Sequence, residues 1–196
     1  MSDYSPARTV LDILQPWFAK KSHTLHAFSA STASYEEWLN WELFDAFLQH
    51  GYHCEGRPSY QQLGNHHLKS LKGDLLATHP DTQEKYLIEV ALVGAGTQNK
   101  WRDKIQRDHE KLQQLQLHNA SLPLHRIQLI FLASCEEHDL VQTWDYWLQG
   151  IEFYQDHSAH CAATIALNHP GMNSQGEVAL LLWNVAAESE KTAAPA

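Results

Sequence analysis

The sequence is poor in cysteine and in positive charge. Its three cysteines, Cys54, Cys135 and Cys161, are far apart and form no CxxC pair, so the pattern indicates neither a disulfide framework nor a zinc ribbon. We therefore expect reduced thiols and a cytoplasmic protein. Lysine and arginine total 14 against 23 acidic residues, a formal net charge of −9. This balance argues against a broad basic surface for tight, non-specific nucleic-acid binding, which depends on neutralising phosphates.

Long apolar runs and several well-known catalytic motifs are also missing. No stretch approaches the roughly 18 apolar residues of a membrane span, and no basic region followed by an apolar one opens the chain, so we expect neither a span nor a signal peptide. The sequence contains no Gly-x-Ser-x-Gly and no His-Glu-x-x-His, and its Gly-rich stretch at 94–100 lacks P-loop spacing. The 14 histidines are scattered without zinc-finger spacing.

The hydrophobic pattern predicts one α/β domain over residues 1–186 and a disordered tail over 187–196. Residues 23–33 read as a loop, and Ser34 with Glu37 fits a capping box at the start of the second helix. We expect helices at 8–20, 35–50, 98–118 and 138–148, and strands at 52–58, 74–78, 86–93, 125–133, 161–167 and 178–185.

Two carboxylates stand where a carboxylate is costly. Glu89 interrupts the near-continuous apolar strand at 86–93, and Asp74 immediately precedes the apolar residues 75–77. An ionised group in a buried strand must be paired, hydrogen-bonded or bound to a metal, because burying it alone costs several kcal/mol. The polar turn at 79–85 is suited to a hairpin, which would bring both acids together. This pattern predicts a divalent cation site built from oxygen ligands.

Asp74, the hairpin and the tripeptide at 89–91 resemble the PD-(D/E)XK nuclease superfamily, over roughly residues 34–133. The resemblance implies a restriction-endonuclease-like core of helix, three strands, helix and strand (αβββαβ), with a central mixed sheet flanked by helices. It implies a DNA endonuclease dependent on Mg²⁺ or Mn²⁺, with RNA as a further possible substrate. Asp74, Glu89 and the Val90 carbonyl would hold the metal. The chain departs from the family pattern at Ala91, where the superfamily has its catalytic lysine.

Two helices extend this resemblance. Residues 41–52 are similar to the first core helix, whose Glu often joins the metal site; Glu42 is the candidate, with a solvated helix face as the equal alternative. Residues 104–112 are similar to the second core helix, to which the catalytic lysine has moved in some members. Lys104, or else Lys100, would then replace the strand lysine. Asp108 lies on the face of this helix that is expected to be buried, one turn after Lys104.

Three further lysines bear on nucleic-acid binding. Lys69 and Lys72 lie just ahead of Asp74, and together with Lys100 they are candidates for phosphate contacts. Solvated residues flanking a strand are the plainer interpretation. Ala91 and the acidic net charge favour a second hypothesis, a catalytically inactive nuclease-fold protein that binds nucleic acid or another protein, such as a nuclease-inhibiting immunity protein. A homodimer or a protein partner is compatible with either hypothesis.

Overall fold

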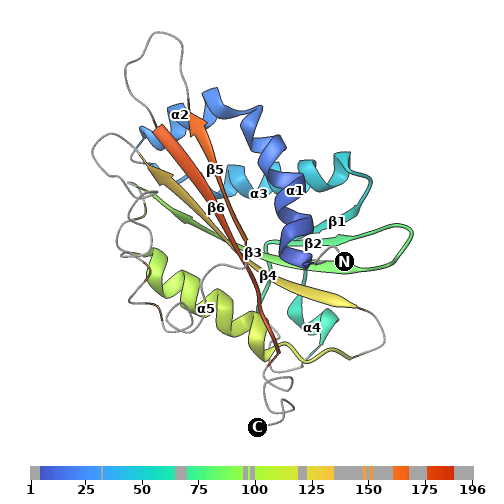
Figure 1. Ribbon diagram of the computed structural model, residues 1–196. Coiled ribbons are helices and arrows are strands. Elements are labelled where there is room, and N and C mark those ends of the chain that lie inside the picture. The colour runs from blue at the N-terminus through green and yellow to red at the C-terminus, as the bar shows by residue number, and fades with distance from the viewer. Residues whose placement is uncertain are drawn as a thin grey trace.

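The computed structural model describes residues 5–31, 33–64, 70–94, 97, 100–118, 123–134, 148, 151, 161–167 and 176–187. These residues form a six-stranded mixed sheet flanked by helices, as expected for an α/β protein (Figure 1). The elements in chain order are α1 (Pro6–Ala19), α2 (Ser22–Ser29), α3 (Glu36–Gln49), β1 (His53–Gly56), α4 (Tyr60–Leu63), β2 (Leu75–Thr78), β3 (Lys85–Val93), α5 (Trp101–Gln114), β4 (Leu124–Ser134), β5 (Cys161–Leu167) and β6 (Gly176–Asn184).

The sheet is mixed because β3 and β4 pair parallel while the other described strand pairs are antiparallel. Its strand order is β1-β2-β3-β4-β6-β5. β1, β2 and β3 pair antiparallel, and the β2–β3 hairpin closes where the His79 N–H donates to the Glu84 carbonyl at 2.8 Å. β3 then pairs parallel with β4, the two strands being joined through α5. β6 runs antiparallel to both β4 and β5. The order from α3 to β4 is therefore helix, three strands, helix, strand, with the short α4 inserted after β1.

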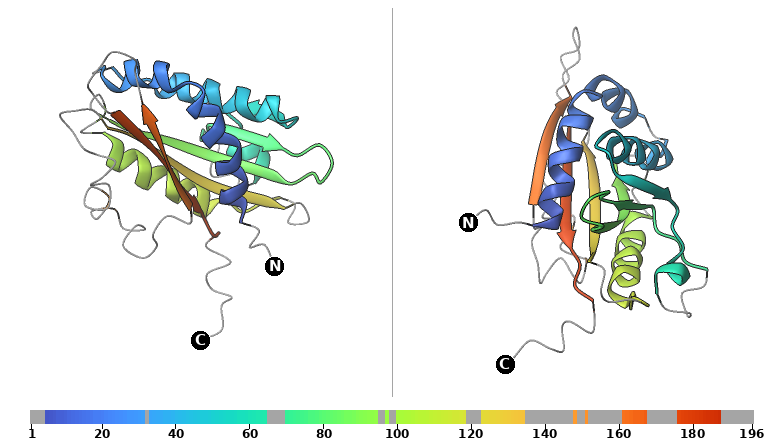
Figure 2. Two further views of the ribbon diagram at one scale, coloured as in Figure 1. Left: turned by 45° about the horizontal axis from the view of Figure 1, so that its top comes forward. Right: turned by 90° about the vertical axis from the view of Figure 1, so that its right-hand side faces the viewer.

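Side-chain alternation along β3 divides the core into two layers. Tyr86, Ile88, Val90 and Leu92 pack with α1, α2 and α3 on one face of the sheet. The residues between them face the other way, where α5 covers the sheet with its buried stripe. Figure 2 shows the same division, with α1, α2 and α3 on one side and α5 on the other. Because the side-chain period of a strand is two, Glu89 and Ala91 both face α5.

Two expectations about the N-terminal part need correction, and two others concern residues outside those described. The segment at 23–33 is not all loop, because α2 covers most of it, with Leu25 and Ser29 buried. The capping box is wrong: Tyr35 is the N-cap of α3 and no side chain caps the helix. Tyr35 is instead packed against Phe28 and Trp38, so aromatic packing determines where the helix begins. The helix expected at 138–148 and the tail after Ala187 lie outside the described residues, Leu148 excepted.

The described residues also bear on the expectations about thiols and membranes. Cys54 and Cys161 are free thiols, and burial raises the pKa of each to about 11. Among the described helices, none is both long enough and apolar enough to cross a membrane. Cys135 lies outside the described residues.

Candidate metal centre

The candidate site forms beside the start of β2, where β3 runs on past its last pair with β2 and keeps only β4 as a strand partner. The last residue of β3 that pairs with β2 is Ile88, opposite Leu75. Beyond Ile88, carboxylate side chains accept hydrogen bonds from backbone N–H groups that would otherwise donate to a neighbouring strand. The Val90 N–H donates to Asp74 Oδ2 at 2.8 Å, and the Leu92 N–H donates to Glu36 Oε2 at 3.4 Å. Acidic side chains are therefore drawn to this edge by unpaired backbone donors, which must be satisfied when buried.

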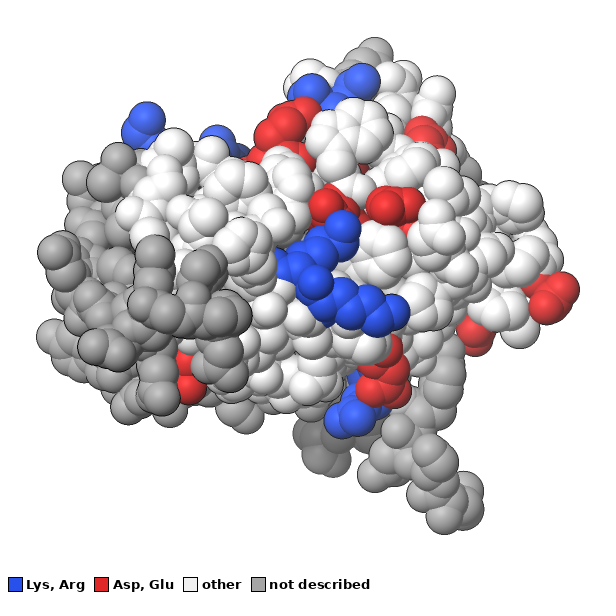
Figure 3. All heavy atoms as spheres, turned by 90° about the horizontal axis from the view of Figure 1, so that it is seen from above, with Lys and Arg blue, Asp and Glu red and all other residues white. Residues whose placement is uncertain are grey.

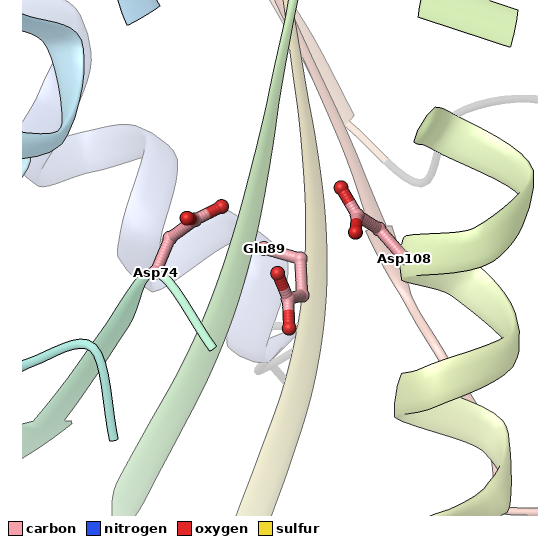
Figure 4. Close-up of side chains that lie close together, drawn as sticks. All are labelled: Asp74, Glu89 and Asp108. Carbon is pink, nitrogen blue, oxygen red and sulfur yellow. The ribbon is translucent and has the colours of Figure 1, made fainter. Parts of the chain in front are cut away.

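Asp74, Glu89 and Asp108 come together at this edge, and we call them the acidic triad. One carboxylate oxygen from each lies within 4.8 Å of the others. Figure 4 shows Asp74 at the start of β2, Glu89 on β3 and Asp108 reaching in from α5. The predicted convergence of Asp74 and Glu89 is thus confirmed, and the buried position of Asp108 on its helix is confirmed as well.

Gly73 allows the chain to approach β3 closely enough to place Asp74. A Cβ at this position would come within 2.9 Å of Leu87 Cδ1, closer than real Cβ contacts, and within 3.5 Å of Glu89 Oε1. The Gly73 N–H also donates to the Pro58 carbonyl at 2.9 Å, and the Arg57 N–H donates to the Asp74 carbonyl at 3.1 Å. The segment before β2 is therefore held by backbone hydrogen bonds against residues 57–58.

Glu89 is buried but not alone. Its side chain is 1% exposed; Oε2 lies 3.0 Å from Lys111 Nζ, and Oε1 accepts a 2.6 Å hydrogen bond from the Tyr60 hydroxyl. Burial, together with the charges of Asp74 and Asp108, raises the pKa of Glu89 to about 8 despite the opposing ammonium of Lys111. Burial and the Glu89 charge likewise raise the pKa of Tyr60, which remains a hydroxyl donor. The Glu89 carboxylate is thus costly to ionise at this site without further positive charge.

Two lysines of α5 flank Asp108. Lys104 Nζ lies 2.7 Å from Asp108 Oδ2, and Lys111 Nζ lies 2.8 Å from Asp108 Oδ1. Lys104 also donates to the Val90 carbonyl at 2.6 Å and lies 3.8 Å from Asp74 Oδ2. Burial lowers the pKa of Lys104, but the surrounding carboxylates outweigh it and raise that pKa above its ordinary value. Lys104 is therefore a permanent cation at neutral pH, unsuited to accepting a proton.

The acid that α3 contributes is Glu36, and the expectation for Glu42 is wrong. Glu36 Oε1 lies 3.6 Å from Lys104 Nζ, and the neighbouring Asn40 amide lies 3.5 Å from Asp74 Oδ1. Glu42 instead accepts a hydrogen bond from Trp17 Nε1 at 2.9 Å and pairs with Lys21 at 2.8 Å. At about 100° per residue, six residues turn a side chain by about 240°, so Glu36 and Glu42 cannot serve the same side of α3.

The remaining predicted site residues are not members of the triad. The Val90 carbonyl, expected as a metal ligand, accepts the Lys104 hydrogen bond, so this oxygen can bind a cation only if Lys104 moves. Lys72 is exposed in a pocket that Asp74 also lines. Lys100 is exposed at the N-terminal end of α5. Lys69 lies outside the described residues.

The donor set is suited to a divalent cation. Four carboxylates, those of the triad and Glu36, contact two lysines, so the fully ionised group carries a net charge of −2. The three oxygens lie within 4.8 Å of one another, whereas adjacent oxygens around octahedral Mg²⁺ are about 3 Å apart, so the triad would have to close around the ion. Gln128, in register with Glu89 on β4, is fully buried, and its amide has no hydrogen-bond partner among the described residues. It adds an unpartnered polar group on the face of the sheet that carries Glu89.

The site residues that the sequence interpretation missed are Glu36, Tyr60 and Lys111. Lys111 had a visible signal, because Lys104, Asp108 and Lys111 are spaced 4 and 3 residues apart and so share one face of α5. Tyr60 had none, since it reaches Glu89 from 29 residues away. Comparison of the chain with protein-family models, curated proteins and solved structures found no match in any of the three.

Proposed function

We propose that the protein is a metal-dependent phosphodiesterase that cleaves nucleic acid, with DNA as the first substrate to test. The observation that carries the proposal is the acidic triad with Lys104 beside it, next to the start of β2. The chain order of α3, three strands, α5 and β4 supports the resemblance to PD-(D/E)XK nucleases, which place their metal at the same point of the core.

Each residue of the site has a distinct role in this proposal. Asp74, Glu89 and Asp108 would hold Mg²⁺ or Mn²⁺ through carboxylate oxygens. When bound there, the metal would polarise the phosphate and lower the pKa of an attacking water. Lys104, which stays protonated and is 24% exposed, places positive charge where negative charge develops on the phosphoryl oxygens. Lys111, 12% exposed, neutralises Glu89 and orients it.

A second candidate function is that of a nuclease-fold binding protein without catalysis. The observation that favours it is the position of Lys104, whose ammonium lies 2.6 Å from the Val90 carbonyl and 2.7 Å from Asp108. An ammonium surrounded by these oxygens competes with a metal for them. In that case the lysine itself stabilises the acidic residues, and the protein acts by binding nucleic acid or a protein partner.

The experiment that separates the two is cleavage of supercoiled plasmid and single-stranded DNA across a titration of Mg²⁺ and of Mn²⁺. The proposed nuclease cleaves with at least one metal, and Glu89→Ala abolishes the cleavage. Asp81→Asn is the matched control, because it removes an exposed acid at the far end of the β2–β3 hairpin. It should cleave like the wild type. A wild type that is inert with both metals overturns the nuclease proposal and favours the binding protein.

A further inference from the structure

A surface pocket adjoins the acidic triad and has the character of a nucleotide subsite. Its volume is about 360 Å³, within the range of small-molecule sites. α3 supplies one wall with Trp41 and Phe44, and the segment before β2 supplies the other. Asp74 and Glu36 line the pocket as well as the candidate metal centre. A ligand held here would therefore extend directly to the proposed site of cleavage.

The aromatic wall is unusually exposed. Trp41 is 64% exposed, although large apolar side chains on a packed helix ordinarily turn inward. Its ring packs edge-on against Phe44, with the ring centroids 6.0 Å apart, which supports the indole from one side. An exposed, supported indole is a stacking platform, and nucleobases stack on such platforms without regard to their sequence.

The opposite wall offers two cations. Arg57 and Lys72 are both exposed, and within the described part of the chain neither side chain pairs with a carboxylate. The backbone of Arg57 has a positive φ of 56°, a conformation that a non-glycine residue adopts at a cost and that recurs at ligand sites. The carboxylates of Glu36, Glu37 and Asp74 also line the pocket, so an anion in it is attracted toward Arg57 and Lys72.

We propose that this pocket binds one unpaired nucleotide of a single-stranded nucleic acid, with the base on Trp41 and a neighbouring phosphate on Arg57 and Lys72. A base inside a duplex is stacked on both faces and is not open to an indole, so the pocket selects single strands. The face in Figure 3 carries a short line of Lys and Arg side chains with Asp and Glu side chains beside it. The placement of the scissile phosphate rests on the proposed function, but the binding does not.

The test is a binding measurement without catalysis. Fluorescence anisotropy with labelled 12-nucleotide DNA, the same sequence in RNA and the matching duplex is recorded in EDTA, so that no cleavage occurs. The wild type should bind a single strand more tightly than the duplex, and comparison of the DNA and RNA arms identifies the sugar. Trp41→Ala should weaken single-strand binding roughly 5- to 150-fold. Leu48→Ala should bind like the wild type, since Leu48 is an exposed apolar residue of the same helix outside the pocket.

The proposed role of Arg57 and Lys72 is tested through the salt dependence of single-strand affinity. The double variant Arg57→Ala/Lys72→Ala should lower the slope of log affinity against log salt by about 0.7, since the two cations share one phosphate and each neutralised phosphate of a single strand contributes about 0.7. Lys20→Ala, which removes an exposed charge outside the pocket, should leave the slope unchanged. Equal affinity for the duplex, unaltered binding by Trp41→Ala, an unaltered slope in the double variant, or no nucleic-acid binding by the wild type would each overturn the proposal.

These outcomes are distinct from failure of the proposed function. Single-strand binding through Trp41 without metal-dependent cleavage retains the subsite and overturns the nuclease. Metal-dependent cleavage that is unchanged in Trp41→Ala, in both kcat and KM, retains the nuclease and overturns the subsite.

Discussion

Glu89 is a carboxyl group in the middle of an apolar strand, and its environment determines its chemistry. Tyr60 and Lys111 contact its two oxygens, yet burial still raises its pKa to about 8. A carboxyl that retains its proton near neutral pH is poorly stabilised as an anion by the protein alone. A divalent cation would supply the missing positive charge, which is why this residue is the most sensitive probe of the candidate site.

The first prediction concerns the pH dependence of stability without metal. The pKa of Glu89 is raised from 4.5 to about 8, so its contribution to folding is fully present below pH 4.5 and is lost as pH rises toward 8. Glu89→Gln stays neutral and escapes this loss. We expect the Tm difference, variant minus wild type, to increase from pH 5 to pH 8.5 in EDTA. Asp81→Asn should show no such trend, and parallel Tm curves for Glu89→Gln and the wild type would contradict the prediction.

The second prediction compares two acids of α3. Glu36→Gln should weaken Mg²⁺ binding, measured by isothermal titration calorimetry, because Glu36 lies beside Lys104 and the triad. Glu42→Gln should leave Mg²⁺ affinity unchanged. It should instead lower the free energy of unfolding by about 1–2 kcal/mol, because the Trp17 and Lys21 contacts lose a charged acceptor. Weaker Mg²⁺ binding by Glu42→Gln alone would reverse the assignment.

At the scale of elements, α5 presents one charged face to the end of β3. Lys104, Asp108 and Lys111 follow one another at helical spacing, and the buried apolar stripe beside them holds this face against the sheet. The two lysines differ in exposure and in partners. Lys104 faces the backbone of β3 and Asp74, whereas Lys111 faces Glu89. The same helix thus carries a charge suited to the substrate and a charge that stabilises a buried acid.

The third prediction separates these lysines. Lys104→Ala should reduce cleavage by about 10²- to 10³-fold, the loss typical when one transition-state charge partner is removed. Lys111→Met should mainly lower stability, by up to about 3–5 kcal/mol and by less where Glu89 takes up a proton. Its cleavage per folded molecule should fall less than that of Lys104→Ala. Denaturant unfolding and single-turnover cleavage of both variants check this. If Lys104→Ala loses stability but cleaves normally, Lys104 is only the partner of Asp108.

For the whole molecule, charge is the property that connects composition to function. A net charge of −9 opposes the approach of nucleic acid, so the proposed binding depends on local positive charge at Arg57 and Lys72. The same excess of carboxylates favours cations. Bound metal should therefore stabilise the fold as well as support catalysis, since the native state alone brings the three acids of the triad together.

The fourth prediction is a metal-dependent shift in Tm. Mg²⁺ at about 100 times its Kd adds about 2.7 kcal/mol to the unfolding free energy, which corresponds to about 5–10 °C for a chain of this size. The shift should be larger at pH 8.5 than at pH 6, because protons compete with metal for Glu89. Differential scanning fluorimetry measures it. Asp74→Asn should remove most of the shift, and an equal shift in that variant would place the metal elsewhere.

Local sequence patterns predicted much of the fold and the convergence of two acids of the triad. The apolar runs of β3, β4 and β6, the stripe of α5 and the hairpin before β3 are confirmed, since each follows from the periodicity of one segment. The convergence of Asp74 and Glu89 could also be predicted from the sequence, because a short turn fixes the pairing of adjacent strands. The eight-residue α2 was not, because its few apolar residues form too weak a pattern.

Only the tertiary structure decided which groups complete the site. Periodicity defines the faces of a helix relative to one another, but not which face docks on the sheet. The resemblance at residues 41–52 implied Glu42, whereas docking places Glu36 at the site. Tyr60 reaches Glu89 across the sheet edge, and the pocket beside Trp41 joins α3 to the segment before β2. These contacts arise from the docking of elements distant in sequence, and no local pattern encodes that docking.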